Sequence, residues 1–126
     1  MIAVDTSSLS AFFEGSDGAD VVLVRSALMT GEIRLPPAVL TEILSDPTPP
    51  RGLRDELAKV ALLEIFEGYW ERAGNMRRTL VSKRLKAKVV DTLIAQSCLD
   101  HDVLLITRDP DFRHFAKYCR LKLAEL

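Results

Sequence analysis

The chain has 126 residues, of which 48% are hydrophobic and 28% charged, and its formal net charge is −1. This length and composition are typical of one globular domain with its own hydrophobic core, expected to span residues 1–126. No apolar run reaches the length of a membrane span, and no basic stretch precedes the apolar N-terminus, which argues against a signal peptide. The two cysteines, Cys98 and Cys119, match no metal-ligand spacing, so we expect reduced thiols in a cytoplasmic protein.

The N-terminal residues predict a strand and then a helix, with an acid at the junction. Residues 2–4 are apolar and short enough for a strand, which ends at Asp5. Residues 6–8 are Thr-Ser-Ser, typical of turns and helix N-caps, and a helix is expected to start over residues 9–13. Asp5 therefore stands at the end of the first predicted strand.

The middle of the chain alternates helical and β patterns. Apolar residues recur at helical spacing in several stretches, and Gly and Pro residues mark the ends of elements. In chain order, we expect a helix over 20–29, a strand over 33–35, a helix over 38–45, a helix over 51–66, a short strand over 67–70 and a helix over 71–85. Glu42 falls at the edge of the apolar face of its helix.

The C-terminal part repeats the arrangement of strand, acid and helix. Apolar spacing from Asp91 predicts a helix with an acid in its first turn, where exposed N–H groups favour an anion. Residues 103–106 are an aliphatic run typical of a strand buried on both faces, and Asp109-Pro110 is a helix-start signal. Residues 121–123 are a candidate edge strand. This alternation predicts an α/β fold, a three-layer α/β/α arrangement around a mainly parallel sheet of four to five strands.

Five acids stand where they could share one site: Asp5, Glu42, Asp91, Asp109 and Asp111. Two of them end strands, and the carboxyl ends of parallel strands meet at the edge where open α/β sheets place their sites. Carboxylates without Cys or His suit Mg²⁺ or Mn²⁺, and such a cation could activate water and stabilise charge on a phosphodiester. Taken alone, Asp91 and Asp109 are better explained as helix caps and Glu42 as an exposed helical residue, and Asp5 and Asp111 fit a turn and a first helical turn, so the hypothesis depends on the whole set.

The small net charge hides an uneven distribution. Residues 1–71 carry a net charge of −7, whereas residues 72–126 carry +6. Seven bases and no acid lie between Arg72 and Lys88, directly before Asp91. This segment is either the solvated face of a helix or a surface that binds phosphates.

Taken in order, these segments resemble the PIN-domain ribonucleases, and in particular the VapC-like toxins of bacterial and archaeal toxin–antitoxin modules. The resemblance covers the whole chain, and although each motif is short, four of them occur in the right order and spacing. The four motifs are residues 2–7 (IAVDTS), 39–44 (VLTEIL), 91–95 (DTLIA) and 105–112 (LITRDPDF). The segment 85–90 departs from relatives that have glycine and small residues before the third acid, which bears on the choice of RNA.

The resemblance implies a Mg²⁺- or Mn²⁺-dependent endoribonuclease that hydrolyses RNA with a metal-activated water. The implied catalytic acids are Asp5, Glu42, Asp91 and Asp109, all of which would also contact the metal, with Asp111 as a further metal residue. The implied substrate-binding residues are Thr6, Ser7, Lys86, Lys88, Arg108 and Arg113. Family members commonly form homodimers and are silenced by a small antitoxin protein, so both partners are expected here.

Two alternatives belong to other functional classes. The first is a catalytically silent PIN-like module that binds RNA or protein. The second is a receiver domain, which would need adjacent acids after the first strand and an acceptor Asp at the end of a mid-chain strand. Asp5 has no acidic neighbour and no predicted mid-chain strand ends in Asp, so the sequence disfavours the receiver.

Overall fold

A parallel β-sheet lies at the centre of the computed structural model, which describes residues 1–126. Strand β1 (Ile2–Val4) runs between β2 (Ile33–Arg34) and β3 (Leu104–Ile106), and both pairings are parallel. Single parallel bridges from Leu35 to Leu62 and from Leu105 to Leu123 extend the sheet at its two edges. The predicted α/β class is confirmed, with three strands and two bridged edge segments making up the sheet.

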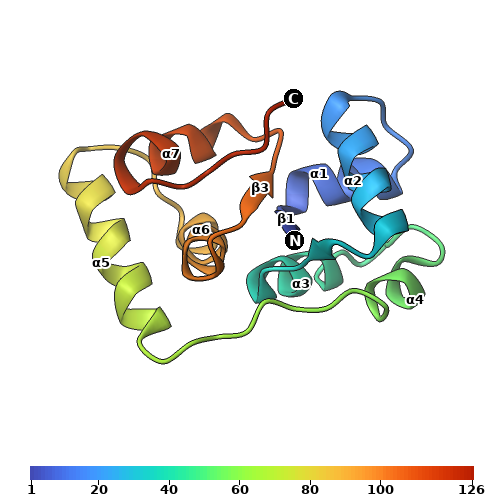
Figure 1. Ribbon diagram of the computed structural model, residues 1–126, viewed down its shortest axis with the longest axis horizontal. Coiled ribbons are helices and arrows are strands. Elements are labelled where there is room, and N and C mark those ends of the chain that lie inside the picture. The colour runs from blue at the N-terminus through green and yellow to red at the C-terminus, as the bar shows by residue number, and fades with distance from the viewer.

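Helices flank the sheet on either side (Figure 1). In Figure 1, α5, α6 and α7 lie on one side of the strands and α1, α2 and α4 on the other, while α3 lies below them and packs against α6. Helix α5 packs against α6, and α1 packs against α2 and α3. The helices are α1 (Thr6–Phe13), α2 (Ala19–Thr30), α3 (Pro37–Leu44), α4 (Leu53–Leu57), α5 (Tyr69–Ser82), α6 (Val89–His101), the 3-10 helix η1 (Pro110–Phe112) and α7 (Arg113–Cys119).

The segment between α3 and α5 corrects two predictions. The helix expected over 51–66 is wrong beyond α4, because residues 61–63 run along the sheet edge: Leu35 donates to the Ala61 carbonyl (3.0 Å) and Leu63 donates to the Leu35 carbonyl (2.8 Å). The strand expected over 67–70 is also wrong. Gly68 has a φ of +83° and ends the loop, and α5 begins at Tyr69, whose side chain is buried.

Three local details also differ from expectation. Helix α1 begins at Thr6 with Asp5 as its N-cap, three residues before the expected start at residue 9. Helix α6 begins at Val89, two residues before Asp91. In β3, Leu105 and Ile106 point to opposite faces of the sheet and both are fully buried, as predicted, whereas Leu104 at the start of the strand is 41% exposed. The predicted helices over 20–29, 38–45 and 71–85 correspond to α2, α3 and α5 within a few residues.

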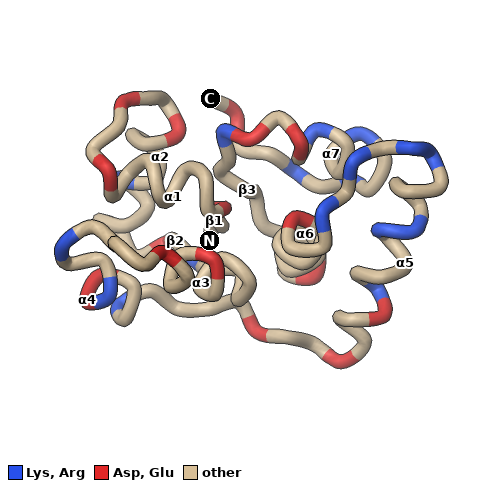
Figure 2. The backbone as a smooth tube through the Cα atoms, turned by 180° about the vertical axis from the view of Figure 1, so that it is seen from behind, with Lys and Arg blue, Asp and Glu red and all other residues tan.

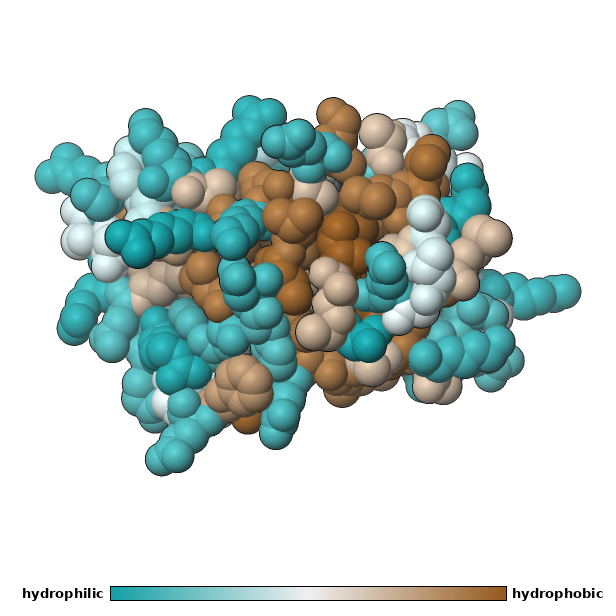
Figure 3. All heavy atoms as spheres, in the orientation of Figure 1, coloured by the Kyte–Doolittle hydropathy of each residue, from teal (hydrophilic) through white to brown (hydrophobic).

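One hydrophobic core joins the sheet to the helices. It contains 24 buried residues, among which Phe112 and Phe115 are the largest, and both come from the chain just after β3. Apolar side chains also reach the surface, and Figure 3 shows them gathered over the centre of one face. No helix combines the length and the apolar character that crossing a membrane requires.

Basic residues remain clustered in the folded chain. Figure 2 shows many of the Lys and Arg residues along α5, the connection from α5 to α6, and α7. Within this region Arg77 donates through Nε to the Ala87 carbonyl (2.7 Å), which ties the connection back onto α5. The basic segment thus leads directly to the start of α6 and to Asp91.

Candidate active site

Asp5 is the most buried acid of the predicted set. It follows β1 at the N-terminus of α1, where its carboxylate accepts from the Ser8 backbone N–H (3.1 Å) and the Ser7 hydroxyl (2.9 Å). Thr107, after β3, donates its hydroxyl to the other carboxylate oxygen (2.7 Å). Burial raises the pKa of Asp5; the hydrogen bonds oppose this rise, and the Asp109 charge adds to it. Asp5 is therefore fixed by groups from two segments.

Asp109 and Asp111 are set by the turn after β3. The Asp109 N–H donates to the Thr107 hydroxyl (3.0 Å), and the Asp109 carboxylate caps η1 by accepting from the Asp111 N–H (2.9 Å). Asp91, Asp109 and Asp111 each present one carboxylate oxygen, and these three oxygens lie within 4.8 Å of one another. The side chain of Lys86 pairs with Asp111 (Nζ to Oδ2, 3.0 Å) and is the one cation in a salt bridge with this group.

Asp91 lies in the first turn of α6 and is half-buried. Burial and the neighbouring charge of Asp109 raise the pKa of Asp91 from 3.8 to about 6, although Lys88 acts in the opposite direction. Carboxylates held this close repel one another, and a bound divalent cation would relieve that repulsion.

Glu42 and Thr6 complete one wall of the site. Glu42 projects from α3, and Thr6 at the start of α1 donates its hydroxyl to the Glu42 carboxylate. An open cleft of about 390 Å³ brings together Asp5, Thr6, Ser7, Glu42, Lys88, Val89, Val90, Asp91, Ile94 and Asp109. Four acids from four separate segments of the chain therefore face one cleft.

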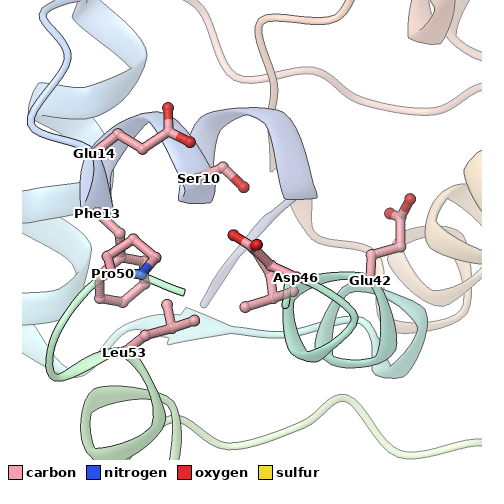
Figure 4. A pocket seen from close by; sticks show the side chains of 8 residues that line it. Ser10, Phe13, Glu14, Glu42, Asp46, Pro50 and Leu53 are labelled. Atoms are coloured by element: carbon pink, nitrogen blue, oxygen red, sulfur yellow. The ribbon is translucent and has the colours of Figure 1, made fainter. Parts of the chain in front are cut away.

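A smaller cavity on the other side of Glu42 lacks these features. Its volume is about 50 Å³, and it is lined by Ser10, Phe13, Glu14, Glu42, Ile43, Asp46, Pro50 and Leu53. Figure 4 shows the Glu42 carboxylate at one end of this cavity, turned away from Pro50 and Leu53. Because none of Asp5, Asp91 and Asp109 lines this cavity, the cleft of about 390 Å³ that contains them is the candidate active site.

Comparison with known proteins gives the family and the fold of this chain. The family model described as the PIN domain matches residues 2–118. This chain belongs to the PIN domain family. Its fold is similar to a chain of VapBC2 from Rickettsia felis bound to a promoter DNA fragment, with a TM-score of 0.76, 17% identity and coverage of 100% and 99% of the two chains. It is also similar to a chain of FitAcB from Neisseria gonorrhoeae, with a TM-score of 0.71, 16% identity and coverage of 99% and 97%. No curated protein matched the sequence.

Membership confirms the predicted resemblance to PIN domains and places the chain in a family whose members are generally nucleases that use a divalent metal. The donor set of this PIN domain fits such an ion, because the cleft offers carboxylates and hydroxyls and no Cys or His. The raised pKa values of Asp5 and Asp91 reflect buried and mutually repelling carboxylates, which a cation would stabilise in their charged form.

Only some of the residues predicted for substrate binding line the cleft of this PIN domain. Thr6, Ser7 and Lys88 line the cleft, and Lys86 reaches its edge through Asp111. The guanidinium of Arg108 instead forms an ion pair with Asp20 (Nε to Oδ2, 2.7 Å), and Arg113 is exposed at the start of α7 without lining the cleft.

Sequence reasoning missed three residues around the cleft: Ser8, Asp20 and Thr107. Thr107 could have been found, because a hydroxyl two residues before an N-cap Asp is placed to accept from its backbone. Asp20 carried no such signal, since an acid in the first turn of a helix is ordinary. In the folded chain it is buried, and the guanidinium of Arg108 lowers the pKa of Asp20 to about 2.

Proposed function

We propose that this PIN domain is a metal-dependent endoribonuclease and the toxin of a toxin–antitoxin pair. The observation that carries the proposal is the convergence of Asp5, Glu42, Asp91 and Asp109 in one cleft. The fold shared with chains of VapBC2 and FitAcB supports the VapC-like assignment. RNA phosphodiester bonds are the proposed substrate, since the basic segment before α6 provides a positively charged surface beside the acids that can bind phosphates.

The acids are proposed to hold Mg²⁺ or Mn²⁺. Asp91, Asp109 and Asp111 would bind it through their clustered oxygens, with Asp5 and Glu42 facing the same cleft. When bound, such a cation lowers the pKa of water and stabilises negative charge on a phosphoryl group. Glu42, oriented by the Thr6 hydroxyl, is placed to orient the attacking water or to take its proton.

Substrate phosphates are assigned to residues at the edge of the cleft. Lys88 lines it directly, and Lys86 pairs with Asp111, so both ammonium groups stand where a polyanion would approach. Thr6 and Ser7 would contact a phosphate oxygen or an ordered water. Exposed Arg113 remains a proposed outer contact, whereas the pairing of Arg108 with Asp20 weighs against its predicted phosphate role.

Protein partners are proposed from the surface next to the cleft. A groove of about 600 Å³ runs between α5 and α6, and its lining includes Trp70, Val81, Val89 and Leu93. Three apolar side chains of this groove, Trp70, Val81 and Val89, are exposed, and a contiguous exposed apolar patch is typical of a surface that binds another protein. A second copy of the chain and a small antitoxin that covers the acid cleft are the proposed partners.

The proposal is tested by incubating the purified protein with single-stranded RNA in Mg²⁺, in Mn²⁺ and in EDTA. Cleavage is expected only with metal and should be lost in Asp5→Asn and in Asp91→Asn. The control Glu125→Gln changes an exposed acid far along the chain and should cleave normally. Full Mg²⁺-dependent cleavage by Asp91→Asn would contradict the site, and metal-independent RNA binding without cleavage by any form would favour the silent module.

A further inference from the structure

The ion pair between Asp20 and Arg108 joins two segments that are far apart in the sequence. Arg108 donates through Nε (2.7 Å) and Nη2 (2.9 Å) to the two carboxylate oxygens of Asp20, and Nη2 also donates to the Asp17 carbonyl (3.1 Å). Asp20 lies in the first turn of α2, whereas Arg108 follows β3. The paired fork geometry fixes both the direction and the distance of the two side chains.

Each member of the pair lies next to a residue that donates a hydrogen bond to the Asp5 carboxylate. Asp20 accepts a hydrogen bond from the Ser8 hydroxyl (2.8 Å), and the Ser8 backbone N–H donates to the Asp5 carboxylate (3.1 Å). Arg108 stands between Thr107, whose hydroxyl binds Asp5, and Asp109. The pair therefore links the two segments that carry Asp5 and Asp109.

The residues around the ion pair are closely packed against it. Asp20 is 4% exposed and Ser8 is fully buried. A Cβ at Gly18 would lie 2.5 Å from the Asp20 carboxylate and 2.9 Å from the Arg108 guanidinium, and Gly18 has a φ of +146°. Only glycine allows the backbone to approach the ion pair this closely, so the turn before α2 is built around it.

We infer that Asp20 and Arg108 are positioning residues that fix the Asp5 carboxylate relative to that of Asp109, and so set the spacing of the metal ligands. This inference rests on the proposed metal site. Neither side chain lines the cleft, so both act through Ser8, Thr107 and the turn that carries Asp109. Partners of this kind typically change metal affinity about 10-fold to 100-fold when removed.

The alternative for Arg108 is direct contact with an RNA phosphate, as the sequence suggested. The two roles make opposite predictions for Asp20. If Arg108 binds phosphate, Asp20→Asn frees a cation and should preserve or strengthen RNA binding without changing metal affinity. If the pair positions the ligands, Asp20→Asn and Arg108→Gln should weaken metal binding equally, and the double variant should lose little more than either single one.

The chain provides a closely matched control pair, Arg72 and Asp100. Its closest N–O distance is also 2.7 Å, and the side-chain exposures are 42% and 8%, against 38% and 6% for Arg108 and Asp20. Arg72 likewise donates to a backbone carbonyl, that of Glu67 (2.8 Å). This pair joins α5 to α6 and contacts none of the proposed metal ligands. Loss of either pair should therefore cost similar stability, but only one should affect the metal.

The experiment is calorimetric titration of the full chain with Mn²⁺, together with thermal denaturation of every variant. Asp20→Asn and Arg108→Gln should bind Mn²⁺ at least about tenfold more weakly, while Asp100→Asn and Arg72→Gln bind as the unchanged protein does. Ser8→Ala removes the hydroxyl that donates to Asp20 and keeps both the ion pair and the Ser8 N–H bond to Asp5, so it separates the pair from Asp5. It gives the same test if an ion-pair variant fails to fold, and it should also weaken Mn²⁺ binding.

Asp91→Asn separates the two possible failures. Loss of Mn²⁺ binding in Asp91→Asn, with unchanged affinity in Asp20→Asn, Arg108→Gln and Ser8→Ala, would overturn the positioning role and leave the metal site standing. Unchanged Mn²⁺ binding in Asp91→Asn would overturn the metal site, and the positioning role with it. Equal weakening by the control pair would show that general loss of stability, not ligand spacing, lowers the affinity.

Discussion

Replacing Asp91 by Asn is expected to stabilise the metal-free protein near neutral pH. The folded chain raises the pKa of this carboxyl from 3.8 to about 6, because burial and the Asp109 charge disfavour its ionised form. The native state therefore binds the proton more tightly than the unfolded chain does. The stability gained from protonation is fully present below pH 3.8 and is lost as the pH rises through about 6.

The size of this effect follows from the shift. A pKa shift from 3.8 to about 6 corresponds to about 3 kcal/mol if the whole shift contributes to the free energy of unfolding. Asp91 is only half-buried, so solvent screening reduces the expected value to about 1–2 kcal/mol. Asparagine resembles the protonated acid in shape and carries no charge, so Asp91→Asn should gain that amount at about pH 7 and nothing at about pH 3.

The assay is urea denaturation in EDTA at both pH values, repeated with excess Mn²⁺. The metal should reverse the order at neutral pH, because it stabilises the native state of the unchanged protein and binds the variant poorly. Glu125→Gln, which removes an exposed negative charge, should leave the free energy of unfolding unchanged. A metal-free Asp91→Asn variant no more stable than the unchanged protein at neutral pH would refute the repulsion argument.

Three further outcomes test other parts of the molecule. Replacing Lys86 and Lys88 together by Ala should weaken RNA binding and reduce the slope of log affinity against log salt by about 1.4, as for two lost phosphate contacts on a single strand. An unchanged slope in a salt titration would show that the two lysines are solvated surface residues that contact no phosphate. Tyr69→Phe removes the hydrogen bond to the Leu93 carbonyl (2.6 Å) and should cost about 1 kcal/mol in urea denaturation, with Mn²⁺ affinity unaltered. Burial raises the pKa of the Cys98 thiol, so iodoacetamide should label Cys98 only on unfolding, and rapid labelling of Cys98 in the native protein, told apart from the less buried Cys119 by peptide mapping, would contradict this.

Local sequence signals determined the elements that carry the acids. Helical spacing of apolar residues predicted α2, α3 and α6, and the aliphatic run before Asp109 predicted β3. The Asp-Pro pair correctly indicated the N-cap of η1. Two strands that each end in an acid were sufficient to suggest a shared site, because parallel strands bring their carboxyl ends to one edge.

Where local signals conflicted with tertiary pairing, the sequence misled. Residues 58–66 contain apolar positions at helical spacing, yet the chain leaves α4 early because the edge of β2 offers backbone partners to residues 61–63. Gly68 then permits the turn into α5, which places Tyr69 over α6. A pattern of side chains does not reveal which backbone groups lie within hydrogen-bonding distance after folding.

The sequence by itself determined which acids this PIN domain has, and the order of strands and helices that brings them to one edge of the sheet. Only the tertiary structure decided how those acids are held. Arg108 lies beside Asp109 in the sequence, so it suggested a phosphate contact, but in the fold its guanidinium meets Asp20. That pairing joins residues 88 positions apart. Residues so far apart meet only after the chain has folded, so local spacing held no signal of their contact.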